Sequence, residues 1–568
     1  MSSKKSKISL PDPFPVNYLR ALNFGSADGH RDNVALEAFI VTSSVRQFFL
    51  NQHSIVVGAI GTGKSTLFRL LKSHSQDIEA YKEDLIVSLE EALSFNELNS
   101  FVKEYYQGKE EKTLYQLLWK FNALSKIAIS ISQMDGFPAN DYEKDINKFL
   151  TDSNSADSYT DIITKVKALV SNATIKLEAN IADNPISFEA GLGDKNNAEQ
   201  KKINLEEVQR AISKAIKERG FRKVTVIIDK IDKFVAGVEY RTQREFISAL
   251  LDVDDDLASD EHINLKVFLR ADLFERLDFS SLGYDKVTDN VVFLKWSKDE
   301  TLRFLATRIL TALKNSKIAH PEQLLQATDL TEFDLSKREK LLLNPKVPKF
   351  VKAWFSKKEK VERNTSLYEK CDKAIITKLF PRDSLHYCVE KQDHIEISTF
   401  DFLSGHFLDG NNVCTPRYML IFLKEVVNKV ASYYEENPDQ VSELVLVNKD
   451  WEWDLFKKNC VYEAYVSAKN TYVKNVGTLE SKWTKNFEVF LAKKGNKTKF
   501  DYKWLRGNIP DISEKDAVDF ISFLQVIGFL KISEAHPDVK KRGYELPILY
   551  KVSPMPNKAI KNGQLTVG

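Results

Sequence analysis

Cysteine and histidine are scarce in this sequence of 568 residues. The cysteines number 4 and the histidines 9, both are dispersed along the chain, and no CxxC pair occurs. Scattered thiols suit a reducing compartment and argue against a disulfide scaffold or a zinc site. The cysteines are Cys371, Cys388, Cys414 and Cys460.

Long apolar runs and a strong charge imbalance are also missing. No stretch of about 18 apolar residues occurs that could span a membrane, and the N-terminal "MSSKKSKISLPDPFP" lacks the apolar core of a signal peptide. We therefore expect a cytoplasmic protein with no membrane contact. The formal net charge of +2 argues neither for nor against a polyanionic partner, so only local patches can carry such an interaction.

A glycine-rich loop stands between an apolar run and a helical pattern. The stretch "IVVGAIGTGKSTLF", residues 55–68, fits the spacing G-x-x-x-x-G-K-[ST]. Glycines let successive backbone N–H groups point at phosphate oxygens, and the helix that follows adds its positive dipole end. Lys64 would reach the β- and γ-phosphates, and the Ser65 hydroxyl would ligate Mg²⁺. The candidate nucleotide-binding residues are Gly58, Gly61, Thr62, Gly63, Lys64, Ser65 and Thr66.

Strands that alternate with helices indicate the fold class. Each expected strand is apolar on both faces, which is typical of a parallel sheet covered by helices on both sides. Residues 135–200 are rich in Asp, Asn and Ser, and "TIKLEANI" and "ISFEAGL" there suggest a β-hairpin insertion. The expected strands are 55–57, 83–89, 223–234, 264–269 and 290–296, and the expected helices are 34–50, 95–106, 113–132, 203–218 and 242–252.

Carboxylates at the end of the most apolar strand complete a nucleotide site. Asp229 follows Val224–Ile228 and would help to hold Mg²⁺, while Asp232 could orient the attacking water. A solvated acidic turn is the alternative. Lys230 occupies the place where many P-loop ATPases carry a catalytic glutamate. Arg270 ends the strand 264–269 and is either a group that stabilises charge near the γ-phosphate or an arginine paired with a nearby acid such as Asp272.

The chain resembles the AAA+/STAND-like P-loop ATPases, and most closely a bacterial group known as the Sll1717-family P-loop ATPases. Residues 24–66 are similar to that group's "FG" element, helix and P-loop, and "VTVIIDKIDKF" is similar to its apolar strand with two aspartates. "KVFLRADLF" resembles its sensor-one strand, and "LKWSKDETLRFLATRI" (294–309) resembles its Leu-x-Trp-Ser junction into a helical lid.

The resemblance implies ATP and Mg²⁺ as cofactors and adds a lid arginine. In "GNNVCTPRYMLIFLKEV" (410–426), Arg417 would match the sensor-two arginine that contacts the nucleotide. Two departures bear on the hydrolysis rate. Ala59 and Ile60 replace the basic residue common inside this group's loop, and Lys233 stands where related ATPases often have Glu.

The C-terminal part suggests a winged helix. A helix over 513–526, with Ser513 and Asp516 at capping-box spacing, precedes a strand "FLKIS", a basic turn and a strand "YELPILYKV". This region either binds DNA or packs against the ATPase and locks it in one state. Acidic residues on the helix favour packing, and for "KVPKFVKAWFSKKEK" (346–360) a solvated lid insertion is favoured. The cations that would contact phosphates are Lys497, Lys499, Lys503, Arg506, Lys540, Lys541 and Arg542.

These observations predict an α/β P-loop NTPase core followed by a helical lid and a C-terminal winged-helix region. The expected function is an ATP-dependent, oligomeric molecular switch that binds and hydrolyses ATP, and the resemblance suggests bacterial signalling or antiphage defence with a separate effector protein. A DNA-binding motor or loader and a weakly hydrolysing ATP-binding scaffold are the alternatives. The expected parts are an N-terminal arm (1–25), the core (26–300) with an insertion near 135–200, a lid (301–430), a helical linker (431–495) and the winged-helix region (496–568).

Overall fold

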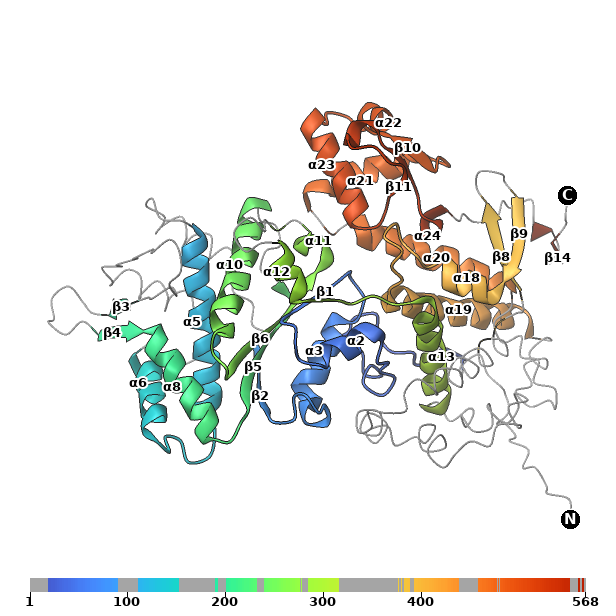
Figure 1. The fold of residues 1–568 in the computed structure, drawn as a ribbon. Helices are drawn as coiled ribbons and strands as arrows, with labels where there is room; N and C mark the ends of the chain where they lie inside the picture. Colours follow the sequence, from blue (N-terminus) through green and yellow to red (C-terminus); the bar gives the residue numbers. More distant parts are fainter. Residues whose placement is uncertain are drawn as a thin grey trace, which may run out of the picture. The chain divides into compact units, whose positions relative to one another are not determined.

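The computed structural model divides into two compact units, which are treated one at a time (Figure 1). Unit 1 comprises Met1–Thr42, Ala59–Gly63 and Lys295–Gly568, and unit 2 comprises Ser43–Gly58 and Lys64–Leu294. The domain boundaries expected from the sequence stay predictions. The structure describes residues 19–89, 111–152, 189–192, 201–231, 240–275, 277, 284–315, 376, 380, 383–388, 393–438, 458–477, 479, 481–551, 560–561 and 564–565.

A five-stranded parallel sheet forms the centre of unit 2. Its strand order is β2-β5-β6-β1-β7, and every neighbouring pair is parallel. The four residues of β1 and five of the six residues of β5 are buried, which is why both read as uninterrupted apolar runs. The predicted parallel α/β core is confirmed. The strands are β1 (Ile55–Gly58), β2 (Asp84–Leu89), β5 (Lys223–Ile228), β6 (Ile263–Arg270) and β7 (Val291–Phe293).

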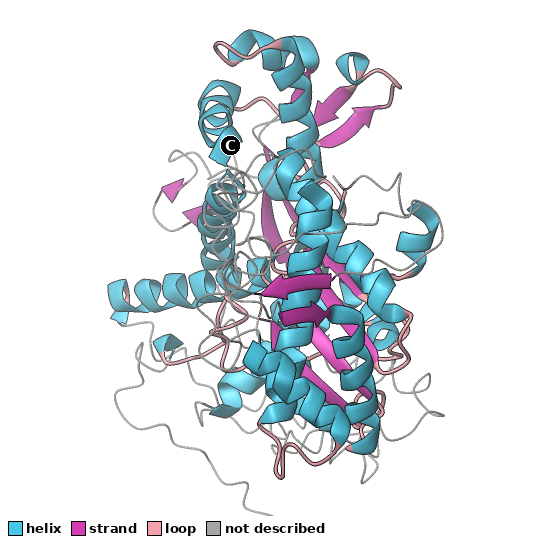
Figure 2. Ribbon diagram, turned by 90° about the vertical axis from the view of Figure 1, so that its left-hand side faces the viewer, coloured by secondary structure: helices cyan, strands magenta, loops and turns pink. Residues whose placement is uncertain are grey.

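Helices cover both faces of this sheet. Helices α5 and α10 lie on one side and α3 on the other (Figure 1). Figure 2, seen from the left-hand side of Figure 1, shows helices in front of the strands. The Asn204 side chain caps α8 by accepting from the backbone N–H groups of Glu206 and Glu207. The helices are α2 (Ser43–Phe48), α3 (Lys64–His74), η1 (Ser75–Asp77), α5 (Glu111–Ser132), α6 (Asp141–Asp152), α8 (Leu205–Glu218), α10 (Tyr240–Ala258), α11 (Ala271–Phe274) and α12 (Tyr284–Asp289).

In this part of the chain one expected helix is shorter than predicted and one helix was missed, while two expectations lie partly or wholly outside the described residues. The helix expected over 34–50 is limited to α2, because the buried apolar residues of 34–40 lie in turns rather than on one helix face. Helix α6 was missed within the polar region. The expected hairpin lies partly outside the described residues, and its described end, β3 (Glu189–Leu192), pairs with β4 (Lys201–Asn204). The helix expected over 95–106 also lies outside them.

Unit 1 is mainly helical around one hydrophobic core. Helices α19 and α20 pack against each other, and Phe402, Phe407 and Tyr465 form a cluster of edge-to-face rings beside them. Helix α19 begins with Pro416 at its first position, as the Pro-Arg pattern predicts. The helices before residue 481 are α13 (Lys298–Asn315), α18 (Thr399–Gly405), α19 (Pro416–Glu436) and α20 (Lys458–Gly477).

The sequence from 297 to about 529 shows no strong strand pattern and predicts long helices, yet the structure has strands there. The strands β8 (Asp383–Cys388) and β9 (Asp393–Ser398) form an antiparallel hairpin. Their sequences "DSLHYC" and "DHIEIS" mix polar and apolar residues, so neither has the apolar run that marks the core strands.

Among the described residues, none of the helices has both the length and the apolar character that a membrane span requires.

Residues 481–551, here named the C-terminal module, follow the order helix, strand, helix, helix, strand, short 3-10 helix, strand, short helix. Its antiparallel sheet has the order β10-β12-β11. The Ser513 side chain accepts from the N–H of Asp516, so the predicted cap is confirmed. The expected strand over "YELPILYKV" is shorter, because Pro547 cannot donate to a ladder and α24 begins after it. The elements are α21 (Ser481–Lys494), β10 (Lys499–Asp501), α22 (Tyr502–Asn508), α23 (Glu514–Val526), β11 (Lys531–Glu534), η6 (Val539–Lys541), β12 (Gly543–Glu545) and α24 (Ile548–Lys551), and the short hairpin β13 (Ile560–Lys561) with β14 (Gln564–Leu565) follows.

A tight joint connects the loop before α19 to the C-terminal module. The N–H of Gly410 donates to the carbonyl of Gly528 (2.7 Å), and a Cβ on Gly410 would lie 2.7 Å from the carbonyl oxygen of Leu530. Asp409 Oδ1 accepts from the backbone N–H groups of Asn411 and Val413, both at 2.9 Å. Burial raises the pKa of Asp409 to about 7.

The substitution Asp409→Asn is expected to remove a pH dependence of stability. The carboxyl has a higher pKa in the folded than in the unfolded chain, so its contribution to the free energy of unfolding falls as pH rises from about 4 to about 7. Asparagine keeps the accepting oxygen without the charge and should be more stable than wild type by on the order of 1–2 kcal/mol at pH 8, with no difference near pH 4. Urea titrations across this range measure the difference.

The nearby Cys414 and Tyr418 do not titrate between pH 4 and pH 8, because burial raises the pKa of each to about 12. They therefore add nothing to the pH dependence of the measured stability difference. A constant difference between wild type and Asp409→Asn at every pH would contradict the raised pKa of this carboxyl.

Candidate functional site

The predicted phosphate-binding loop lies between β1 and α3. Gly61 and Gly63 have φ values of +85° and +102°, the left-handed region that favours glycine. Lys64 is the first residue of α3, and its Nζ donates across the loop to the carbonyl of Gly58 (2.7 Å). The side chain of Thr62 donates to the carbonyl of Ala59 (2.9 Å) and closes the turn. The loop is therefore folded back on itself at the N-terminus of a helix, where backbone N–H groups have no partner within the helix.

Residues 59–63, here named the loop tip, belong to unit 1 and have partners there. The indole N–H of Trp296 donates to the carbonyl of Thr62 (2.9 Å), and the backbone N–H of Arg417 lies 3.4 Å from the carbonyl of Gly61. A Cβ on Gly61 would lie 2.5 Å from the Cβ of Arg417 and 3.4 Å from that of Thr415. Only a glycine allows the loop tip to come this close to the start of α19.

The side chain of Arg417 is engaged with the N-terminal segment. Its Nε donates to the carbonyl of Ala27 (2.9 Å). Residues 24–32 are held in turn by Arg308 of α13, which binds Asp32 with both terminal nitrogens (3.1 and 2.8 Å) in a buried ion pair and also donates to the carbonyl of Phe24. Bidentate arginine–carboxylate contacts fix orientation as well as distance, so this segment is a rigid part of unit 1.

In unit 2, Asp229 follows the end of β5 and is 4% exposed. The next residue, Lys230, has a φ of +65°, which costs a non-glycine residue about 1 kcal/mol and turns the chain sharply after the carboxylate. Such strain persists where the surrounding structure requires it, which is common at functional sites. Asp232 and Lys233 lie outside the described residues, so the predicted role of Asp232 stays a prediction.

Arg270 ends β6 directly beside the loop strand, since it is the register partner of Gly58. Its guanidinium binds Asp272 through Nε (2.9 Å) and Nη2 (2.5 Å), and both side chains are largely buried. Of the two alternatives drawn from the sequence, the pairing with Asp272 is observed. The pair is adjacent to the loop strand β1. The predicted role of Arg270 toward the γ-phosphate stays a prediction.

Except for Asp232, which lies outside the described residues, the structure gives the predicted residues places within their own units. Arg270 lies beside Gly58 in unit 2, and Arg417 contacts the loop tip in unit 1. Sequence reasoning gave no role to Trp296, although its position in "LKWS" was noted, and it assigned no carboxylate to Arg308. The sequence signal that could have pointed to Trp296 is its place at the junction between the predicted core and the helical region. Nothing in the sequence links Asp32 to Arg308, because 276 positions separate them.

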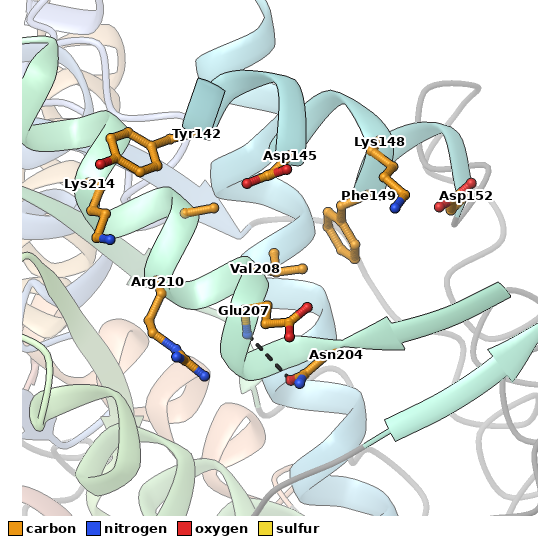
Figure 3. A pocket seen from close by; sticks show the side chains of 11 residues that line it. Tyr142, Asp145, Lys148, Phe149, Asp152, Asn204, Glu207, Val208, Arg210 and Lys214 are labelled. Atoms are coloured by element: carbon orange, nitrogen blue, oxygen red, sulfur yellow. Dashed lines mark hydrogen bonds between the residues drawn. The ribbon is translucent and has the colours of Figure 1, made fainter. Parts of the chain in front are cut away.

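A separate cavity of about 300 Å³ lies between α6 and α8 (Figure 3). Its walls carry charges of both signs around an apolar floor that includes Phe149 and Val208, and Lys214 lies over the ring of Tyr142 with Nζ 5.0 Å from the centroid. Neither helix bears a residue of the predicted nucleotide site. The cavity therefore adds no group to that site.

Comparisons with known proteins find distant similarity. No family model matches the sequence. A protein of Escherichia coli (strain K12) described as "Putative transposon gamma-delta 80.3 kDa protein" is 27% identical over 313 residues, which cover 51% of this chain and 40% of that protein. The alignment thus spans well under half of the relative's length. A solved structure of the Aeropyrum pernix ORC2 protein in ADPNP and ADP complexes aligns with 91% of this chain and 90% of its own at 10% identity and a TM-score of 0.32. The assignment of a P-loop core rests on the sheet and the loop described above.

The substitution Gly61→Ala is expected to disturb the loop tip more than Gly63→Ala. Both alanines would adopt a positive φ at a cost of about 1 kcal/mol in the free energy of unfolding. A Cβ at position 63 meets no atom within 4 Å, whereas one at position 61 overlaps Arg417 and should cost about 1–3 kcal/mol more. Urea denaturation of the two variants measures the difference, and equal losses would show that the loop tip is not pressed against α19.

Proposed function

We propose that this chain is an ATP-binding and ATP-hydrolysing P-loop ATPase that works as a molecular switch. The observation that supports this most is the loop between β1 and α3, with its two left-handed glycines, Lys64 at the helix start and the buried Asp229 after β5. A strand, a glycine-rich turn and a helix in this order are the context that the phosphate-binding motif requires.

In this proposal the triphosphate is held by backbone N–H groups of the loop and the N-terminus of α3. Lys64 exchanges the carbonyl of Gly58 for oxygens of the β- and γ-phosphates. The hydroxyl of Ser65 and the carboxylate of Asp229 are the groups that would hold Mg²⁺, and their hard oxygens suit that ion. When bound, Mg²⁺ neutralises charge on the phosphates. Thr62 and Thr66 complete the polar lining of the loop.

Hydrolysis in this proposal uses Asp232 to orient the attacking water and Arg270 to stabilise charge on the γ-phosphate. Arg270 is already held in a fixed orientation by Asp272, so it would contribute by exchanging one carboxylate contact for a phosphate oxygen. The alternative of a weakly hydrolysing ATP-binding scaffold is favoured by Lys230, which stands in a left-handed conformation where many P-loop ATPases carry a catalytic glutamate. Measured turnover of ATP decides between the two.

The switch itself would depend on the loop tip and α19. The chain passes from one unit to the other on each side of residues 59–63, so a change in the loop backbone on ATP binding is transmitted along the chain itself. Arg417 is the proposed reader of the γ-phosphate, because its backbone and side chain already link Gly61 to Ala27. A ligand shifts such an equilibrium only through contacts that differ between the states.

We propose further that the C-terminal module is a winged helix and that the protein belongs to the Sll1717-family P-loop ATPases of the AAA+/STAND-like class. The order of elements in the module and the positions of the four matching motifs support this. An oligomeric assembly, an effector protein and a role in bacterial signalling or antiphage defence come from the resemblance alone. The transposon in the description of the E. coli relative supports the other alternative, a DNA-dependent motor or loader.

The substitution Lys64→Ala should abolish detectable ATP binding, because no other side chain replaces its contact with the β- and γ-phosphates. Isothermal titration calorimetry with ATP and Mg²⁺ measures the affinity, and the loss should be at least about 100-fold, or about 2.7 kcal/mol. Lys72→Ala removes an exposed lysine from the same helix and serves as the matched control. Unchanged affinity of Lys64→Ala for ATP and Mg²⁺ would contradict the proposed nucleotide site.

The substitution Arg417→Ala should reduce ATP affinity modestly and remove the difference in shape or assembly between the ATP and ADP states. A charge-assisted contact to the γ-phosphate is worth about 1.5–3 kcal/mol before desolvation, and ADP cannot make it. Small-angle scattering in both nucleotides measures the difference, with the exposed Lys424→Ala of α19 as control. If Arg417→Ala keeps the full difference in scattering between the ATP and ADP states, this arginine has only a structural role, which is its hydrogen bond to the carbonyl of Ala27.

A further inference from the structure

The cations of the C-terminal module divide into two groups by what they contact. Lys540 Nζ binds Glu514 at the start of α23, and Lys482 binds Asp516 on the same helix (3.1 Å). Arg542 donates to the carbonyl oxygens of His536 and Pro537, which fixes the turn between β11 and β12. Among residues 481–551, all of which the structure describes, the exposed cations that have no ion pair are Lys485, Lys493, Lys497, Lys499, Lys503, Arg506, Lys515 and Lys541.

Helix α22 and the turn η6 bring several of these cations together. The two elements contact each other, and Lys540 Nζ lies 6.0 Å from the ring centroid of Tyr502. Lys503 and Arg506 are three positions apart on α22 and share its exposed face, while Tyr502 and Leu505 are buried beneath them. We name this surface the α22 ridge, and it consists of Lys503, Arg506, Lys540 and Lys541.

The carboxylates near the α22 ridge have hydrogen-bond partners of their own and offset only part of its charge. Arg506 and Lys540 both lower the pKa of Glu514, with the hydrogen bond from Lys540 as the larger cause, so one carboxylate is shared by two cations. Asp501 and Asp538 are used as caps, and they accept from the backbone N–H groups of Trp504 and Lys540. Lys497 and Lys499 are exposed on the segment that leads into α22 and extend the positive surface.

Helix α23 has the opposite character. Its exposed positions include Glu514 and Asp519, and Asp516 is partly exposed. Carboxylates on the helix would repel a phosphate backbone. A polyanion is therefore expected to contact the module through α22 and η6 rather than through α23.

We propose that the α22 ridge binds the phosphate backbone of duplex DNA without sequence preference. A duplex carries one negative charge per about 1.7 Å of its axis, so a short row of cations is sufficient for contact. Among the described residues, Lys503 and Lys541 have no ion pair, whereas Lys540 is paired with Glu514. Between 497 and 545, the large apolar side chain that is strongly exposed is Ile532 of β11. A membrane surface requires an apolar face beside the cations, and a tight protein interface requires buried apolar anchors, so both fit this surface less well.

The test measures binding of a fluorescent duplex DNA of about 30 base pairs by anisotropy, at salt concentrations between about 50 and 200 mM. The full chain is used without nucleotide and in the Lys64→Ala background, so the result does not depend on the proposed ATP site. The double variant Lys503→Ala with Arg506→Ala should bind about tenfold or more weakly at the lowest salt. Its slope of log affinity against log salt should be smaller by about 2, since each lost phosphate contact removes about 0.9.

The matched control is Lys485→Ala with Lys515→Ala, which removes the same charge from exposed positions of α21 and α23 and should change affinity less than about twofold. Glu514→Gln should instead tighten binding several-fold, because it frees Lys540 and Arg506 from their shared carboxylate.

Three outcomes would overturn the proposal. Wild-type protein without salt-dependent DNA binding is the first. Equal losses in the α22 variant and in the control would mean that total charge, or α23, carries the binding. Tighter binding to anionic lipid vesicles than to DNA, lost in the α22 variant, would assign the surface to membranes.

Discussion

The close approach of Gly61 to Arg417 is the constraint on which the rest of the site depends. Because the loop tip leaves no room for a side chain at this point, its backbone follows any displacement of the start of α19. Trp296 holds the neighbouring carbonyl of Thr62, so two elements of unit 1 fix a loop whose remaining residues belong to the strand and helix of unit 2. The loop tip is therefore fixed by side chains and backbone groups that lie far from it in the sequence.

Two arginines that the structure describes are held by carboxylates in different ways. Arg308 and Asp32 are nearly inaccessible, at 5% and 3% side-chain exposure, and breaking such a pair would leave an uncompensated buried charge. Arg270 and Asp272 are only two positions apart at the end of a strand, so this pair fixes one side chain locally. The first pair joins segments that are far apart in the sequence and therefore maintains the fold of unit 1.

Much of unit 2 could be predicted from the sequence, because burial dictates its pattern. Strands with both faces covered read as apolar runs, and the loop motif fixes where one of them ends. The segment 34–42 was predicted as helix because its apolar residues have helical spacing. They are buried in turns instead, and spacing alone does not separate these two structures. The hairpin β8–β9 was missed for the opposite reason, since its residues are mixed in polarity. Pairings across long separations, such as Asp32 with Arg308, depend on tertiary structure that local patterns do not encode.

The discontinuity of unit 1 has a consequence for the order in which the chain can acquire its structure on the ribosome. Residues 19–42 are made before unit 2, yet Arg308, which donates to the carbonyl of Phe24 and pairs with Asp32, lies beyond residue 295. Residues 43–294 contain all five strands of the parallel sheet. Most of unit 2 can therefore fold before residues 19–42 have their partners from the rest of unit 1. Exposed apolar residues such as Leu19 and Phe24, which are buried in the finished protein, are then a liability during synthesis that ends only when α13 and α19 emerge.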